Sequence, residues 1–297
     1  MSNEQQKVEE QENIFELLEK AKDIFKQYGT FLGEFKAQKV VFIGDTHGAI
    51  DITKYAFDNF YDKVDLMVFL GDYVDRYPPK GVENLQLILE KMVQTDGKKV
   101  LVLRGNHESP ITNYYYGFYD EVKQKFGDEN VYEKFKDFFS YMPYAAVVNG
   151  YFCVHGGLPS KVDSDGNLVL GINSVDDIKK LPYPDTEPSD TIAMQLLWND
   201  PREGLEELTF VPNIRGEGIY YFGKKVVDQF LSQTGLKGII RGHEAVDGFR
   251  IDIDKKIITV FSSVYHGQSA GILYINGDEI KRIFIGQDKT IYELNGL

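Results

Sequence analysis

The chain has 297 residues, and 42% of them are hydrophobic, which is enough for a large folded core and unlike a disordered protein. Its net charge of −13 argues against sequence-independent nucleic-acid binding, because such binding depends on lysine and arginine. The single cysteine, Cys153, excludes an internal disulfide and favours a reducing, cytoplasmic compartment. No apolar run reaches the roughly 20 residues needed to cross a membrane. We therefore expect neither nucleic acid nor a membrane among its partners.

The first half of the chain alternates predicted strands and helices. Residues 1–13 are polar and acidic, so we predict a flexible segment there and no signal peptide. Apolar residues then recur at helical spacing from Ile14 to Phe25. Three strands and two intervening helices follow, at residues 40–43, 49–61, 66–70, 82–95 and 100–103. This alternation is typical of a parallel α/β core.

The second half is mostly predicted strand. Two aromatic-rich helices at 114–126 and 132–141 precede a hairpin at 145–154, whose turn is Asn149-Gly150. Residues 160–190 are rich in Asp, Pro and Gly and are interpreted as a long excursion. A helix, a strand and four antiparallel strands are then predicted at 226–231, 238–240, 249–253, 257–261, 272–275 and 280–284. Since no linker divides the chain, residues 14–297 are predicted to form one domain with two sheets.

The histidines share one position relative to the predicted strands. All five lie just after an apolar run: His47, His107, His155, His243 and His266. A single histidine is more often structural than catalytic. Five at strand ends indicate a shared site instead, because α/β sheets bind ligands beyond the carboxyl ends of their strands.

Oxygen donors stand beside these histidines. An Asp after Gly is usually a turn or a helix cap, but that explanation does not cover two such Asp residues with histidine partners. Oxygen and imidazole donors without thiolate suit Mn, Fe or Zn rather than a structural zinc site. Six donors with one shared aspartate match a two-metal centre. The six candidates are Asp45, His47, Asp72, Asn106, His155 and His243.

Four arginines lie in glycine-bearing turns. The planar guanidinium suits two-pronged binding of a phosphate, although a salt bridge to a nearby acid is the simpler alternative. We expect salt bridges for Arg104 and Arg241, which directly adjoin strands. We expect phosphate contacts for Arg76 and Arg215.

These motifs, taken in order, resemble those of a known family. GDTHG, GDYVDR, RGNHE, HGGLP and RGHE are similar to the metallophosphoesterase motifs of the phosphoprotein phosphatase family. The GD.HG…GNHE part also marks diadenosine tetraphosphate hydrolases and many phosphodiesterases. YGFYDE at 116–121, LLWNDP at 196–201 and RGEGIYYFG at 215–223 narrow the resemblance to the serine/threonine phosphatase branch. It extends over about residues 39–285.

The resemblance implies a fold and a metal centre. The expected fold is α/β and calcineurin-like, with a central two-sheet β-sandwich flanked by helices. Asp45 and His47 would bind a first metal ion, and Asp72 would bridge to a second. The second ion would be held by Asn106, His155 and His243. The cofactors implied are two divalent ions, Mn²⁺ first and Fe or Zn as alternatives.

The resemblance also implies a reaction. A metal-bridging hydroxide would attack phosphoserine or phosphothreonine monoesters of phosphorylated proteins directly. His107 would be the general acid, oriented by Asp75, while Arg76, Arg215 and Asn106 would bind the phosphoryl group. The alternatives are a nucleotide or diadenosine polyphosphate hydrolase and an inactive phosphoprotein-binding scaffold. No regulatory subunit can be named from the sequence.

Two segments depart from the family pattern. Tyr77 stands where the family usually has Gly after the Arg of GDYVDR. The family's FSAPNY loop is here FSSVYHG, residues 261–267, which lacks the Pro. The loop tyrosine is either Tyr265 or has been displaced by His266. Because this loop overhangs the expected site, we expect altered substrate choice and altered sensitivity to toxins.

Overall fold

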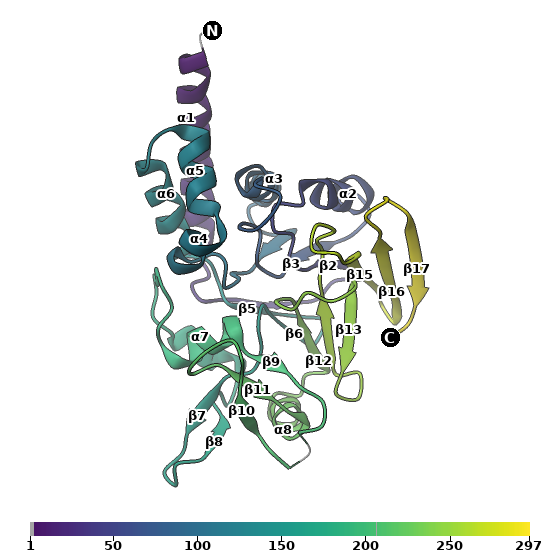
Figure 1. Cartoon of the computed structure of the whole chain (residues 1–297). Coiled ribbons are helices and arrows are strands. Elements are labelled where there is room, and N and C mark those ends of the chain that lie inside the picture. Colours follow the sequence, from purple (N-terminus) through teal and green to yellow (C-terminus); the bar gives the residue numbers. More distant parts are fainter. Residues whose placement is uncertain (1–2, 206) are drawn as a thin grey trace.

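Two six-stranded sheets form the centre of the molecule in the computed structural model, which describes residues 3–205 and 207–297 (Figure 1). The first sheet has the order β17-β16-β15-β2-β3-β4. Its strands are β2 (Lys39–Ile43), β3 (Leu66–Phe69), β4 (Val100–Val102), β15 (Ala270–Asn276), β16 (Glu279–Ile285) and β17 (Ile291–Asn295). β2, β3 and β4 pair in parallel, which the predicted strand–helix alternation requires.

The second sheet has the order β1-β5-β6-β12-β14-β13. Its strands are β1 (Phe31–Phe35), β5 (Ala145–Val148), β6 (Tyr151–Val154), β12 (Gly238–Arg241), β13 (Phe249–Asp252) and β14 (Ile257–Val260). The predicted 145–154 hairpin is confirmed as the antiparallel pair β5–β6. β6, β12 and β14 pair in parallel, so three more strands deliver their loops to one edge.

Side-chain alternation along the strands explains why the two sheets pack together. Val40 and Phe42 of β2 share a buried cluster with Ile240 of β12, between the sheets. Val41 and Ile43, which point the other way, belong to the core beneath the outer helices. β2 is therefore apolar on both faces, as expected for a strand covered on two sides.

Helices cover the outer face of each sheet. α1 (Asn3–Lys26), α2 (Ile50–Phe60), α3 (Gly81–Gln94), α5 (Phe118–Phe126) and α6 (Asn130–Phe139) contribute to the core on the first sheet. α7 (Thr191–Trp198), α8 (Lys224–Thr234) and the 3₁₀ turn η1 (Val175–Lys180) contribute to the core on the second. The predicted two-sheet sandwich flanked by helices is thus observed.

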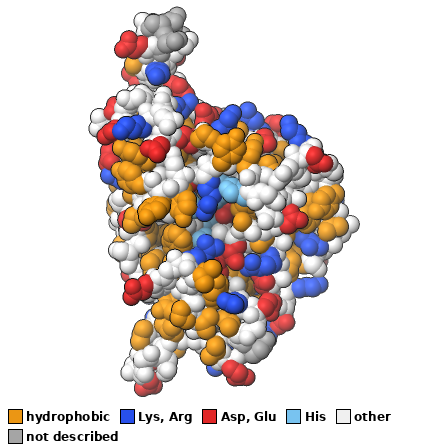
Figure 2. Space-filling model, in the orientation of Figure 1, with side chains coloured by type: hydrophobic (Ala, Val, Ile, Leu, Met, Phe, Trp, Pro, Cys, Tyr) orange, Lys and Arg blue, Asp and Glu red, His pale blue; other side chains and the backbone are white. Residues whose placement is uncertain are grey.

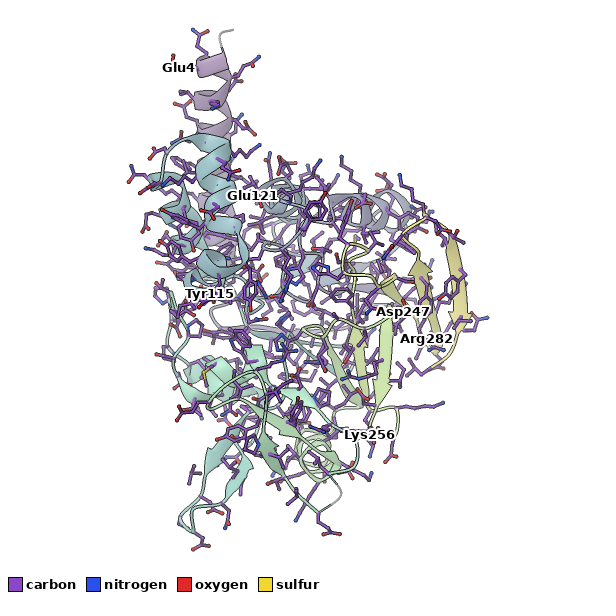
Figure 3. All side chains as sticks on the ribbon, in the orientation of Figure 1. Glu4, Tyr115, Glu121, Asp247, Lys256 and Arg282 are labelled. Atoms are coloured by element: carbon purple, nitrogen blue, oxygen red, sulfur yellow. The ribbon has the colours of Figure 1, made fainter. Side chains whose placement is uncertain are left out.

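Several local predictions were wrong. Residues 3–13, expected to be flexible, are helical and form the first turns of α1, with Glu4 at its projecting end (Figure 3); residues 1–2 lie outside the described residues. The helix expected at 114–126 is two helices, α4 (Pro110–Tyr116) and α5, separated at Gly117, whose φ is 111°. The four late strands do not form one antiparallel set, because β13 and β14 belong to one sheet and β15 and β16 to the other.

The segment 160–222, which includes the excursion predicted at 160–190, contains more structure than predicted. A hairpin of β7 (Ser160–Val162) and β8 (Leu168–Leu170) begins it. A small sheet of β9 (Asp200–Pro201), β10 (Phe210–Pro212) and β11 (Tyr220–Phe222) follows α7. Among the described helices, none is both long and apolar enough to span a membrane.

Candidate active site

Strand ends from both sheets meet at one pocket. Asp45, Asp72 and Asn106 follow β2, β3 and β4, while His155 and His243 follow β6 and β12. The pocket has a volume of about 210 Å³. Eight of the ten predicted site residues line it, namely Asp45, His47, Asp72, Arg76, Asn106, His107, Arg215 and His243. The other two, Asp75 and His155, are buried directly behind it.

The backbone at the site is unusually strained. Five of these non-glycine residues have positive φ angles: His47 at 43°, Asp72 at 62°, Asp75 at 66°, Arg76 at 65° and His243 at 75°. Such conformations cost free energy and cluster at functional sites. Gly105 shows how tightly the loops pack, because a Cβ there would lie 2.2 Å from Asp72 Oδ1.

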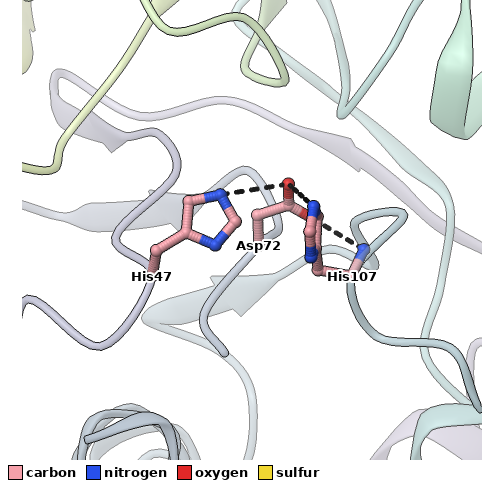
Figure 4. Close-up of side chains that lie close together, drawn as sticks. All are labelled: His47, Asp72 and His107. Carbon is pink, nitrogen blue, oxygen red and sulfur yellow. Dashed lines mark hydrogen bonds and ion pairs between the residues drawn. The ribbon is translucent and has the colours of Figure 1, made fainter. Parts of the chain in front are cut away.

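Asp72 lies between the imidazoles of His47 and His107, which come from different loops (Figure 4). His47 Nδ1 donates to the carbonyl of Val74 at 2.8 Å, so its Nε2 carries a lone pair. That Nε2 lies 3.5 Å from Asp72 Oδ2 and 3.8 Å from Asp45 Oδ2. Burial and the neighbouring His107 hold the pKa of His47 well below its usual value, which keeps the ring neutral. Two carboxylate oxygens therefore lie within 4 Å of one neutral imidazole nitrogen.

A second group of donors also includes Asp72. His155 Nδ1 is 2.8 Å from the carbonyl of Leu70, and its Nε2 is 2.8 Å from Asn106 Oδ1 and 3.2 Å from Asp72 Oδ2. His243 Nε2 lies 3.1 Å from the Trp198 carbonyl, which leaves Nδ1 free to act as a ligand. Ligand atoms of Asp72, His155 and His243 lie within 4.8 Å of one another.

The electrostatics of this cluster fit bound divalent cations. Burial raises the pKa of Asp45 to about 6, and the neighbouring Asp72 carboxylate adds to the rise. Burial lowers the pKa of His155, but the Asp72 carboxylate outweighs it and the net pKa rises to about 9. The buried carboxylates of Asp72 and Asp45 therefore favour a positive charge beside them. Each imidazole is also fixed by a carbonyl on its other nitrogen, as is usual for metal-ligating histidines.

His107 is oriented by a buried carboxylate. Its Nδ1 lies 2.8 Å from Asp75 Oδ2, while its backbone N–H donates to Asp72 Oδ1 at 2.9 Å. Asp75 is held in turn by the Phe118 N–H at 2.9 Å and by the Asn113 amide at 3.1 Å. Burial lowers the pKa of His107, but Asp72 and Asp75 outweigh it and raise the net pKa above its usual value.

The two predicted phosphate-binding arginines are held differently. The Arg76 guanidinium lies over the ring of Tyr116, 4.6 Å from its centroid. Arg215 Nε donates to Asp200 Oδ2 at 2.6 Å and its Nη2 lies 3.5 Å from the His243 carbonyl, so the guanidinium is anchored on a side chain that lines the pocket. Both arginines therefore combine a fixed side chain with accessible donors.

The other two arginines are structural. Arg241 forms the predicted salt bridges, to Asp200 at 2.8 Å and to Glu244 at 2.5 Å. For Arg104 the predicted salt bridge was wrong. Its buried guanidinium donates to the backbone carbonyls of Glu108, Asp185 and Thr186 instead. Arg104 thereby satisfies loop carbonyls beneath the RGNHE turn.

Comparison with known proteins identifies this arrangement. Residues 38–247 match the family model described as calcineurin-like phosphoesterase. The chain belongs to the calcineurin-like phosphoesterase family. The fold and family resemblance predicted from the motifs are thereby confirmed.

Two further relatives place this phosphoesterase near serine/threonine phosphatases. A probable serine/threonine-protein phosphatase of Encephalitozoon cuniculi is 36% identical over 239 residues, which cover 78% of this chain and 48% of that protein. The chain therefore spans about half the length of this relative. A protein serine/threonine phosphatase structure from Saccharomyces cerevisiae, with similarity to human phosphatase PP5, matches with a TM-score of 0.78 and 25% identity, covering 96% of this chain and 89% of that one.

A third solved structure shares the fold alone. The cold-active protein-tyrosine phosphatase of a psychrophilic Shewanella species matches with a TM-score of 0.58 and 19% identity. The match covers 88% of this phosphoesterase and 82% of that chain.

The structure shows site residues that sequence reasoning missed. Glu108 accepts backbone hydrogen bonds from Asp72, Tyr73 and Gly105 at 2.8–2.9 Å, and so joins the loops after β3 and β4. Asp200 anchors Arg215. Glu108 lies in RGNHE and Asp200 lies in LLWNDP, two of the motifs on which the family resemblance rests. Their positions in these motifs were the sequence signal that could have identified them. Tyr116, Trp198 and His266 also line the pocket.

The structure shows which residue of the altered 261–267 loop lies at the pocket. His266, not Tyr265, lies at the pocket, with its ring 5.4 Å from that of His47. His266 Nδ1 is 3.1 Å from the Ser263 hydroxyl, which fixes the ring. Tyr265 instead packs against Tyr77, with ring centroids 5.9 Å apart. In this phosphoesterase the two departures from the family pattern are therefore in contact.

Proposed function

We propose that the protein is a metal-dependent protein phosphatase acting on phosphoserine and phosphothreonine. The observation that carries the proposal is the juxtaposition, in one pocket, of a metal-fitting donor cluster, two arginines and an oriented His107. The named activities of its relatives in Encephalitozoon and Saccharomyces support the same reaction.

The donor cluster would hold two divalent ions, for which Mn²⁺ is our first choice and Fe or Zn the alternatives. Asp45 and His47 would bind one ion, with Asp72 shared. Asn106, His155 and His243 would bind the other. Bound metal ions lower the pKa of water and so supply a nucleophile at neutral pH. His47 is neutral and fixed by Val74, so it is already in the protonation state that a ligand needs.

The chain's own residues perform the rest of the reaction. Arg76, Arg215 and the Asn106 amide would orient the phosphoryl oxygens, and the arginines would offset the charge that develops on them. His107 would donate the proton on Nε2 to the departing alkoxide oxygen, which is too basic to leave unprotonated. Asp75 keeps the opposite nitrogen, Nδ1, protonated and the ring aimed into the pocket.

The partners we propose are phosphorylated proteins. A pocket of about 210 Å³ accommodates a phosphoryl group and the nearest substrate atoms, so the rest of the substrate must lie outside. A buried free thiol, Cys153, supports a reducing, cytoplasmic location as part of the proposal.

Metal analysis combined with turnover tests the proposal. Purified protein should contain two divalent ions per chain and hydrolyse phosphoserine and phosphothreonine peptides. A phosphotyrosine peptide and a diadenosine polyphosphate serve as comparison substrates. Faster hydrolysis of the diadenosine polyphosphate would favour the nucleotide hydrolase instead. Metal-loaded protein that binds phosphopeptides without turning them over would indicate a scaffold.

A further inference from the structure

Two tyrosines form an exposed aromatic pair beside the pocket. Tyr77 is 68% exposed and Tyr265 is 43% exposed, yet their rings meet edge to face at 5.9 Å and an interplanar angle of 80°. Exposed aromatic side chains that gather at one place often mark a binding site. The pair joins two loops, one after β3 and one after β14, and so has a defined position.

The pair lies next to residues that line the pocket. Tyr77 directly follows Arg76, and Tyr265 directly precedes His266, and both of these neighbours line the pocket. Tyr116, which is 42% exposed, stacks on Arg76 from α4. Figure 2 shows hydrophobic side chains beside the blue and pale-blue side chains on this face. A substrate that extends from the pocket past Arg76 and His266 therefore meets aromatic side chains.

Charge indicates what kind of substrate fits there. The chain carries a net charge of −13, so its overall charge disfavours acidic residues flanking a phosphorylated residue. The tyrosine pair is neutral and offers ring faces and edges. Aromatic rings pair favourably with other aromatic and aliphatic side chains.

We propose that Tyr77 and Tyr265 form a specificity site for a large apolar side chain adjacent to the phosphorylated residue of a protein substrate. The inference rests on the proposed function. It concerns residues that the family pattern does not supply, since Tyr77 replaces a glycine and Tyr265 belongs to the altered loop. The ring surfaces, not the hydroxyl groups, make the contact.

Matched phosphothreonine peptides test this site. Three peptides differ only in the two residues that flank phosphothreonine, which are Phe, Ser or Glu. The enzymes are wild type, Tyr77→Ala, Tyr265→Ala, Tyr77→Phe and the control Tyr292→Ala. Tyr292 is 46% exposed on the edge strand β17, away from the pocket. Hydrolysis of p-nitrophenyl phosphate normalises each variant for the integrity of its pocket.

In the wild type, kcat/KM for the Phe-flanked peptide should exceed that for the Ser-flanked peptide roughly tenfold, through KM, and the Glu-flanked peptide should be poorest. The preference should largely disappear in Tyr77→Ala and Tyr265→Ala and persist in Tyr77→Phe and Tyr292→Ala. Equal kcat/KM values in the wild type, or an unchanged preference in Tyr77→Ala, would overturn the specificity site while leaving the phosphatase intact. Hydrolysis of p-nitrophenyl phosphate without hydrolysis of any phosphopeptide would overturn both proposals.

Discussion

The His107 imidazole and the Asp75 carboxylate lie 2.8 Å apart through Nδ1 and Oδ2, and both are buried at the back of the pocket. Asp75 has a positive φ of 66°, so the backbone is strained to place this carboxylate. Its other oxygen accepts the N–H of Phe118, the first residue of α5. The break between α4 and α5 thus provides the donor that fixes the pair.

Replacing His107 by Asn should remove the proton donor but keep the metals. General acid catalysis typically contributes roughly 10²–10⁴-fold, so turnover of a phosphoserine peptide should fall by about that factor. Turnover of p-nitrophenyl phosphate should fall much less, because its leaving group departs without a proton. Steady-state kinetics on both substrates, with metal analysis, provide the check. Equal losses on both substrates with intact metals would make His107 a charge stabiliser instead.

Replacing Asp75 by Asn should resemble the His107 substitution in milder form. The imidazole stays in place but loses the carboxylate that holds its proton on Nδ1 and orients it. We expect Asp75→Asn to lower turnover of phosphoserine peptides more than turnover of p-nitrophenyl phosphate. The loss on phosphoserine peptides should be smaller than that caused by His107→Asn. The double variant with His107→Asn should be little worse than His107→Asn alone, since the two residues act as a unit. Additive losses in that double variant would show that Asp75 acts independently of His107.

Removing the metals should abolish activity, and Asp72 should matter most among the ligands. Asp72 Oδ2 lies within 4.0 Å of His47, His107 and His155, so its substitution affects both proposed ions. We expect Asp72→Asn to lose metal and activity on all substrates. Chelation should inactivate the wild type, and Mn²⁺ should restore it best. Asp165→Asn, in the turn between β7 and β8, is the control. Full activity in metal-stripped protein would exclude the two-metal site.

Replacing Arg215 by Lys should lower kcat/KM even though the charge is kept. Arg215 binds Asp200 through Nε and also lines the pocket, and a single ammonium group cannot both keep that anchor and offer a planar pair of donors to phosphate. A charge-assisted hydrogen bond is worth about 1.5–3 kcal/mol. We therefore expect a fall of at least tenfold, the factor for about 1.4 kcal/mol. Arg202→Lys is the matched control, because Arg202 lies over Tyr221 outside the pocket. Wild-type kcat/KM in Arg215→Lys would remove Arg215 from phosphate binding.

Local sequence was sufficient for the elements that deliver the ligands. β2, β3 and β4 are apolar on both faces, and each ends at a glycine-bearing polar loop, so both strand and loop are encoded within a few residues. Parallel pairing then brings Asp45, Asp72 and Asn106 to one edge whatever the details of packing. The same logic placed His155 and His243. All ten predicted site residues consequently meet at or directly behind one pocket.

The tertiary structure alone decided how those residues are held and what surrounds them. The anchoring of Arg215 by Asp200 joins residues 15 positions apart, and Asp75 reaches across 43 positions to the N–H of Phe118. Likewise, the two departures from the family pattern are far apart in sequence, yet Tyr77 and Tyr265 touch. Periodicity reports which side of a strand is buried, but not which distant loop lies against it. Such contacts depend on how the two sheets pack together, and local residue patterns do not predict that packing.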